Sequence, residues 1–279
     1  MRLSRPLLSA FGAVTLAAGS MVWSGAAHAA GPSYVALGDS YSSGTGAGSY
    51  DPDSGSCKRS ANAYANLWAA SHTTESFRFV ACSGATTTDV ASGQLGALNS
   101  STTLVSITAG GNDAGFSDVM QTCVLYSTST CQSRAAQAET YMRDTLPGRL
   151  DSLYSKIRAK APSARVVVLG YPRLYTIVDW CVGLGNAKRT ALNDAADTLA
   201  GVTAKAAGRS GFTWSDVRDE FSGHELCSGD DWLNAVTWPI ESSYHPTARG
   251  HRLGYLPALT GSARTALKSP AKTSSKSEG

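Results

Sequence analysis

The chain has 279 residues, of which 42% are hydrophobic and 16% charged, and its formal net charge is +3. Five of the basic residues lie at the two ends of the chain, at Arg2, Arg5, Lys268, Lys272 and Lys276. The sole acidic residue in these end segments is Glu278. The body is therefore close to neutral and has no basic cluster, which excludes a nucleic-acid partner, because phosphates require a positive face.

The chain begins with a basic segment, followed by an apolar stretch from Pro6 to Val22 and by Ala27-His28-Ala29. This order is typical of a secretory signal peptide that ends in an A-x-A cleavage site, and it predicts a leader over residues 1–29. A membrane anchor is the alternative, but glycines and serines interrupt the stretch, which is weak for the roughly 20 apolar residues of a span. We expect an extracellular protein without stable membrane insertion.

Short β-branched runs alternate with helix-forming stretches along the rest of the chain. The predicted strands are Tyr34 to Leu37, Phe77 to Ala81, Leu104 to Thr108 and Val166 to Leu169. The predicted helices are Arg134 to Lys160, which Pro147-Gly148 should kink or split, Lys188 to Ala207 and Thr247 to Leu267. This alternation predicts an α/β fold, a three-layer α/β/α sandwich around a parallel sheet. We expect one domain over residues 30–267 and a disordered Ser- and Lys-rich tail over residues 268–279.

Six cysteines follow the leader, at Cys57, Cys82, Cys123, Cys131, Cys181 and Cys227. An even number in an exported chain predicts disulfides, and the absence of C-x-x-C pairs and of close Cys and His residues argues against a structural metal. Six cysteines allow 15 pairings. We expect pairing in sequence order, because each such bond closes a fairly local loop.

Candidate chemistry begins where the first predicted strand ends, in Leu37-Gly38-Asp39-Ser40. Active sites of parallel sheets gather at the carboxyl ends of the strands, and a serine that opens the next helix directs its Oγ into that cleft. Ser40 is thus a candidate nucleophile. On its own it is more simply explained as a helix cap, a common role of serine after a strand.

The next two strand ends strengthen the case for catalysis. Gly84 follows the second strand and permits a tight turn that brings a backbone N–H close to a ligand. Asn112 follows the third strand, after Gly110-Gly111. Acyl transfer needs donors aimed at a developing oxyanion, and such N–H and amide groups are suitable. Each would be an ordinary turn alone; together, at successive strand ends, they indicate an active site.

The general base must be one of four histidines beyond the leader, His72, His224, His245 and His251. His245 lies in a loop just before the last predicted helix, where Pro246 favours an extended conformation that can reach the cleft. His224 and His251 are more simply explained as surface or packing residues. His245 is therefore the predicted base.

Four ordered segments, Gly38-Asp39-Ser40, Gly84, Gly110 to Asp113 and His245-Pro246, resemble the four blocks of the SGNH (GDSL-type) hydrolases. The wider sequence resembles secreted actinomycete lipases and phospholipases A1. The resemblance implies Ser40 as nucleophile, His245 as general acid and base, and an oxyanion hole made by the Ser40 and Gly84 N–H groups and the Asn112 amide. It implies neither a metal nor an organic cofactor.

One position departs from the common family pattern. Many members read D-x-x-H, but here Ser242 lies three residues before His245, and Glu241 is out of register. We therefore predict that the main-chain carbonyl of Ser243 accepts the His245 Nδ1–H. Secreted members that resemble this chain use such a dyad as well.

The resemblance favours a carboxylic-ester hydrolase acting on phospholipid or acylglycerol esters, as a phospholipase A1, a triacylglycerol lipase or both. Carbohydrate acetylesterase and thioesterase activities are the alternatives, and a non-catalytic secreted binding module is a more distant one. Neither the G-x-S-x-G elbow of α/β-hydrolases nor a nucleotide-binding glycine loop is present. We expect a monomer that contacts lipid surfaces transiently.

Overall fold

The computed structural model describes residues 31–268. The predicted signal peptide, residues 1–29, lies outside this range. So does the predicted tail apart from Lys268, which ends the last helix rather than beginning the tail.

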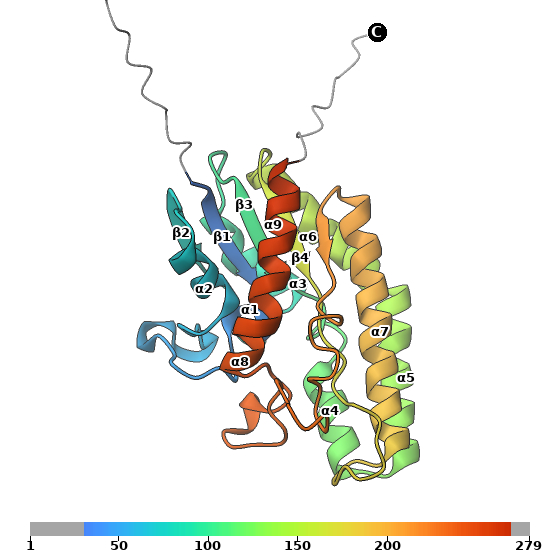
Figure 1. The fold of residues 1–279 in the computed structure, drawn as a ribbon. Coiled ribbons are helices and arrows are strands. Elements are labelled where there is room, and N and C mark those ends of the chain that lie inside the picture. The colour runs from blue at the N-terminus through green and yellow to red at the C-terminus, as the bar shows by residue number, and fades with distance from the viewer. Residues whose placement is uncertain (1–30, 269–279) are drawn as a thin grey trace, which may run out of the picture.

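A parallel sheet of five strands forms the centre of the molecule, in the order β2-β1-β3-β4-β5 (Figure 1). The strands are β1 Ser33–Gly38, β2 Ser76–Phe79, β3 Leu104–Thr108, β4 Arg165–Leu169 and β5 Thr213–Ser215. The inner strands β1 and β3 are buried along their whole length, which explains why neither contains a charged residue. The four predicted strands are confirmed, although β2 ends at Phe79 rather than Ala81, and β5 was not predicted.

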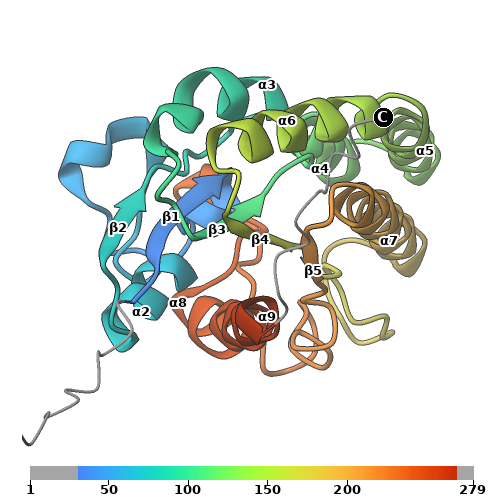
Figure 2. The ribbon, with the colours of Figure 1, turned by 90° about the horizontal axis from the view of Figure 1, so that it is seen from above.

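Helices cover both faces of this sheet. The α-helices are α1 Ser40–Ser43, α2 Tyr64–Ser71, α3 Thr87–Asp89, α4 Phe116–Leu125, α5 Thr128–Asp144, α6 Leu146–Lys160, α7 Asn186–Arg209, α8 Ala248–Gly250 and α9 Leu256–Lys268. The other helical turns are η1 Pro52–Cys57, η2 Val90–Gln94, η3 Leu95–Ala97, η4 Ile240–Ser242 and η5 His251–Tyr255. Figure 2 shows α3 and α6 on one face, α2 and α9 on the other, and α5 beside α7 at the β5 end. The predicted three-layer α/β/α architecture is confirmed.

Two of the predicted helices are interrupted, each for a local reason. The stretch expected to contain a kink divides into α5 and α6 at Thr145, and Pro147 lies in the first turn of α6, where the N–H that proline lacks has no helical partner. The closing helix begins one residue later than expected because the Thr247 side chain caps it, accepting from the Gly250 N–H. It continues through the π-helical turn η5 into α9.

The six cysteines form three disulfides, in the order expected. Cys57–Cys82 joins the segment after α1 to the loop after β2, Cys123–Cys131 joins α4 to α5, and Cys181–Cys227 joins two loops near the carboxyl ends of the strands. No helix within residues 31–268 combines the length and hydrophobicity that crossing a bilayer requires.

Candidate active site

Ser40 lies just beyond the carboxyl end of β1, as the first residue of α1. The cap of this helix is Asp39, whose side chain accepts a hydrogen bond of 3.0 Å from the Tyr41 N–H. The helix-cap explanation therefore applies to Asp39 and not to Ser40. The Ser40 residue is only 6% exposed, and its hydroxyl is directed to a different partner.

That partner is His245, whose Nε2 lies 2.7 Å from Ser40 Oγ. On the other side of the ring, Nδ1 lies 3.0 Å from the Ser243 carbonyl oxygen. Because a carbonyl only accepts, Nδ1 carries the proton and Nε2 presents its lone pair to the serine hydroxyl. Burial lowers the pKa of His245 to about 4. The imidazole is therefore neutral at neutral pH and can accept a proton.

The loop that holds His245 is fixed by three contacts. The Tyr41 hydroxyl donates to the Tyr244 carbonyl at 2.6 Å, and the Asn234 backbone N–H and side-chain amide both donate to the His245 carbonyl at 2.9 Å. Tyr244 has a φ of 63°, so the chain turns sharply just before the histidine. At Gly46, whose φ is 89°, an added Cβ would lie 2.8 Å from the His245 Cβ. Glycine is therefore required there.

Within residues 31–268, no carboxylate forms a hydrogen bond with the His245 imidazole. The Glu241 side chain points to solvent and forms an ion pair with Lys58. The main-chain carbonyls of Ser243 and Glu241 act to raise the pKa of His245, but less than burial lowers it. The geometry is that of a histidine held by main-chain oxygens.

The three oxyanion-hole candidates are not all placed alike. Asn112 lines the same pocket as Ser40, and its amide donates to the Ala85 carbonyl at 3.0 Å. Gly84 precedes Ala85, is exposed and has a φ of 80°, but it does not line that pocket. Within residues 31–268, neither the Ser40 nor the Gly84 N–H donates a hydrogen bond. Both remain available to a ligand.

Sequence reasoning missed the buried polar network beneath the serine. Asp39 accepts from the Thr108 hydroxyl at 2.6 Å and from the Tyr171 hydroxyl, so it connects the ends of β1, β3 and β4. Burial raises the pKa of the Asp39 carboxyl to about 6, although these hydrogen bonds lower it. Thr108 and Tyr171 carry no local signal for this role, because the contacts exist only after the strands align.

An apolar pocket opens at Ser40. It extends between α4, α5 and α7 and the loop that follows β4, and its apolar lining includes Phe116, Val119, Met120, Met142, Leu174 and Leu199. Sequence reasoning missed this pocket as well, since apolar residues on a helix face predict core packing and not a cavity.

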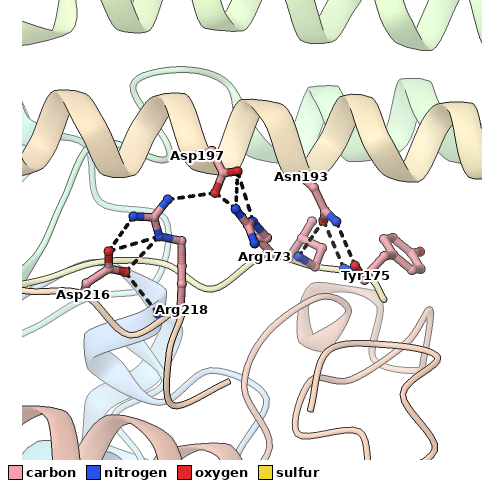
Figure 3. A network of polar contacts seen from close by, with 7 residues as sticks. Arg173, Tyr175, Asn193, Asp197, Asp216 and Arg218 are labelled. Carbon is pink, nitrogen blue, oxygen red and sulfur yellow. Dashed lines mark hydrogen bonds and ion pairs between the residues drawn. The ribbon is translucent and has the colours of Figure 1, made fainter. Parts of the chain in front are cut away.

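One wall of the pocket is fixed by polar contacts to α7 (Figure 3). The Asn193 side chain accepts from the N–H groups of Leu174 and Tyr175, at 3.0 and 3.1 Å, and donates to the Tyr175 carbonyl at 2.7 Å. Beside it, Asp197 pairs with Arg173 and Arg218. The loop after β4 is therefore held rigidly against the helix.

The other three histidines of residues 31–268 have packing roles. His251 is completely buried and accepts from the Tyr64 N–H, while His72 and His224 stack on tryptophan rings. The same residues contain no group of three or more His, Cys, Asp or Glu side chains arranged to hold a metal ion.

Comparisons with known proteins identify the family of the chain. Residues 36–253 match the GDSL-like lipase/acylhydrolase family. The chain is 58% identical over 262 residues to lipase 1 of Streptomyces coelicolor, and the match covers 94% of this chain and 97% of that one.

The chain also superposes on two crystal structures, each with a TM-score of 0.82 and 58% identity. One is phospholipase A1 from Streptomyces albidoflavus NA297, covering 84% of this chain and all of that one. The other is an extracellular lipase from Streptomyces rimosus, covering 83% of this chain and 99% of that one. The protein therefore belongs to the GDSL-like lipase/acylhydrolase family and is a serine ester hydrolase.

Proposed function

We propose that the protein hydrolyses the esters of phospholipids and acylglycerols through a Ser40–His245 dyad. The observation that carries this proposal is the opening of an apolar pocket directly at Ser40, whose Oγ lies 2.7 Å from His245 Nε2. The pair supplies the chemistry and the pocket accommodates a hydrocarbon chain.

In the proposed mechanism, Ser40 Oγ attacks the ester carbonyl while His245 Nε2 takes the hydroxyl proton. The oxyanion of the tetrahedral intermediate is stabilised by the N–H groups of Ser40 and Gly84 and by the Asn112 amide. His245 then protonates the leaving alcohol, and an acyl-enzyme remains. Water, deprotonated by His245, releases the acid in a second cycle. The Ser243 carbonyl keeps the imidazole in the required tautomer throughout.

Lipid esters fit the site better than small acyl groups do. The wall of the pocket is almost entirely apolar and is formed by side chains from three helices and one loop, which suits a hydrocarbon chain. An acetyl group would contact only a small part of this lining. The relatives are named lipase and phospholipase A1, in agreement with a long acyl chain.

We also propose that the protein is exported and acts as a monomer. The leader-like residues 1–29 and the three disulfides support export, since disulfides persist in oxidising compartments. One of the similar structures is described as an extracellular lipase. The site itself is built from a single chain.

Fatty-acid release from phosphatidylcholine vesicles and from a triglyceride emulsion, compared with acetate release from acetylated xylan, tests the proposal. Wild type should release fatty acids, whereas Ser40→Ala and His245→Ala should each lose roughly 10⁴- to 10⁶-fold in kcat. Ser92→Ala and His72→Ala are matched controls, because both residues lie outside the site.

Two results would contradict the proposal. Substantial turnover by Ser40→Ala would exclude this serine as the nucleophile. Release of acetate from xylan without release of fatty acids would exclude lipid esters and establish the acetylesterase alternative.

A further inference from the structure

Large apolar side chains that face solvent gather on three segments, Val124–Tyr126, Ile177–Val182 and Val236–Ile240, here called the apolar rim. Within the described part of the chain, Leu253 is the one large exposed hydrophobic outside them. The exposures are high, with Val182 at 92%, Trp238 at 88% and Trp180 at 66%. Scattered apolar residues on a surface are normal, but a contiguous group of this kind marks an interaction site.

The three segments adjoin one another although they are far apart in the sequence. Val124, Trp180, Val182 and Val236 line one groove, together with Tyr244. Figure 1 shows where they lie, in the C-terminal part of α4 and the loops that precede α7 and α8, at the lower end of the molecule where the strands end. The apolar rim is therefore one surface, at the end of the molecule that holds Ser40.

The exposed apolar side chains are held in place from below. The completely buried Arg189 guanidinium donates to the carbonyls of Val178, Cys181 and Val182. The Cys181–Cys227 disulfide anchors the same segment. Lys188 Nζ donates to the Tyr126 carbonyl at 2.5 Å and so ties the end of α4 to α7. Structured support of this kind indicates a preformed surface and not a frayed loop.

The charged side chains beside the apolar rim are engaged within the protein. Two of them line the groove: Lys188 donates to the Tyr126 carbonyl, and Asp231 accepts from the Ser228 N–H. Asp179 accepts from the Asn186 amide, and Glu241 is paired with Lys58. A strongly charged partner would therefore find no cluster of opposite charge here. An apolar surface with tryptophans suits the boundary between lipid headgroups and hydrocarbon, where amphipathic aromatic rings are favoured.

The apolar rim is also continuous with the site. The Ser243 hydroxyl accepts from the Thr237 N–H at 2.9 Å, which joins the Trp238 turn to the residue whose carbonyl orients His245. Tyr244, which lines the groove, directly precedes the histidine. A surface resting on the apolar rim would therefore lie beside the catalytic loop.

We propose that the apolar rim docks the enzyme onto the surface of a lipid aggregate, with Trp180, Val182 and Trp238 entering the headgroup region. The inference rests on the proposed function, because it assigns to that function an aggregated substrate and a surface that binds it. Adsorption brings the mouth of the apolar pocket at Ser40 to the lipid. Because the rim has no cluster of like charges, zwitterionic vesicles should be enough to bind the enzyme.

Binding to phosphatidylcholine vesicles by cosedimentation tests the proposal, with Ser40→Ala as the background so that the lipid is not consumed. Leu125→Ser, Val182→Ser and Ile240→Ser change one exposed residue in each segment, singly and together. Leu253→Ser, an exposed leucine outside the apolar rim at 39% exposure, is the matched control. Each rim substitution should raise the lipid concentration for half-binding about tenfold, since one buried apolar side chain is worth about that factor. Added salt should have little effect.

Hydrolysis of a soluble short-chain ester by the same variants with Ser40 intact should remain at the wild-type level, which also shows that they fold. Vesicle binding by the rim variants equal to that of the Leu253→Ser control would overturn the proposal, even if phosphatidylcholine is hydrolysed. Vesicle binding without hydrolysis of any lipid by the Ser40 enzyme would instead refute the proposed function and leave the surface assigned. A wild-type dimer in sedimentation that the rim substitutions dissociate would show the apolar rim to be a subunit interface.

Discussion

Acidification should reveal how His245 is held. Burial lowers the pKa of His245 to about 4, whereas the pKa of an exposed histidine is about 6.5. The protonated imidazole cannot take the Ser40 proton, so kcat/KM should fall as the pH drops below the pKa of His245. At about pH 5.5, a pKa of about 4 leaves about 97% of the base neutral, against about 9% for an ordinary histidine, a roughly tenfold difference in activity.

The assay is kcat/KM for a soluble short-chain ester as a function of pH, with near-UV circular dichroism recorded at each pH. The second measurement is needed because His245 and His251 both have folded-state pKa values below the ordinary value, at about 4 and about 3. As the pH falls, these two histidines bind protons at a higher pH in the unfolded chain than in the folded protein. The stability that their neutral side chains contribute is therefore complete above about pH 6.5 and declines as the pH falls toward the folded-state pKa values.

A half-maximal activity near pH 6.5 in a protein that is still folded would refute this reasoning, because it would place the imidazole in an ordinary, hydrated environment. Lys58→Met provides a directional check. The Lys58 charge lowers the pKa of His245, so its removal should move the acid limb of the profile upward. A downward shift would show that another charge dominates.

Three substitutions test other parts of the site. Glu241→Gln should change kcat less than about twofold, because its side chain faces Lys58; a loss near the 10⁴-fold of a missing triad carboxylate would disprove the dyad. Gly46→Ala should lower kcat on a soluble ester with little change in KM, since the added Cβ would press on His245 at 2.8 Å; unchanged kinetics would show that the loop yields freely. Asn193→Ala should lower the free energy of unfolding by about 1–3 kcal/mol in urea titrations, because it leaves buried Tyr175 backbone groups without partners, and an unchanged midpoint would contradict this.

The parts of the fold that could be predicted are those in which burial acts on contiguous residues. The strand Leu104–Thr108 was predicted to the residue because it is covered on both faces, so every position is apolar or small. The strand Thr213–Ser215 lies at the sheet edge, has three residues and is partly exposed, so it gives no periodic signal. Helix α2, Tyr64–Ser71, was not predicted either, since its apolar positions form only a weak stripe.

The site divides in the same way. Ser40 and His245 could be proposed because histidine is rare in this chain and because each lies at a recognisable strand or helix boundary. The apolar pocket at Ser40 could not be predicted, because its walls come from α4, α5 and α7, and each helix by itself has an ordinary apolar face. The apolar rim could not be predicted either, because sequence alone does not distinguish an exposed Val182 from a buried one.

The motif aspartate illustrates why local sequence names a residue without explaining it. Asp39 is almost completely buried, and its folded-state pKa of about 6 lies above the ordinary value of 3.8. Its contribution to stability is therefore complete below about pH 4 and is lost as the pH rises through about 6, so at neutral pH the ionised carboxylate opposes folding. Its acceptor bonds with Tyr41, Thr108 and Tyr171 join α1 to the ends of three strands. We infer that Asp39 positions Ser40 for the histidine, at the expense of stability.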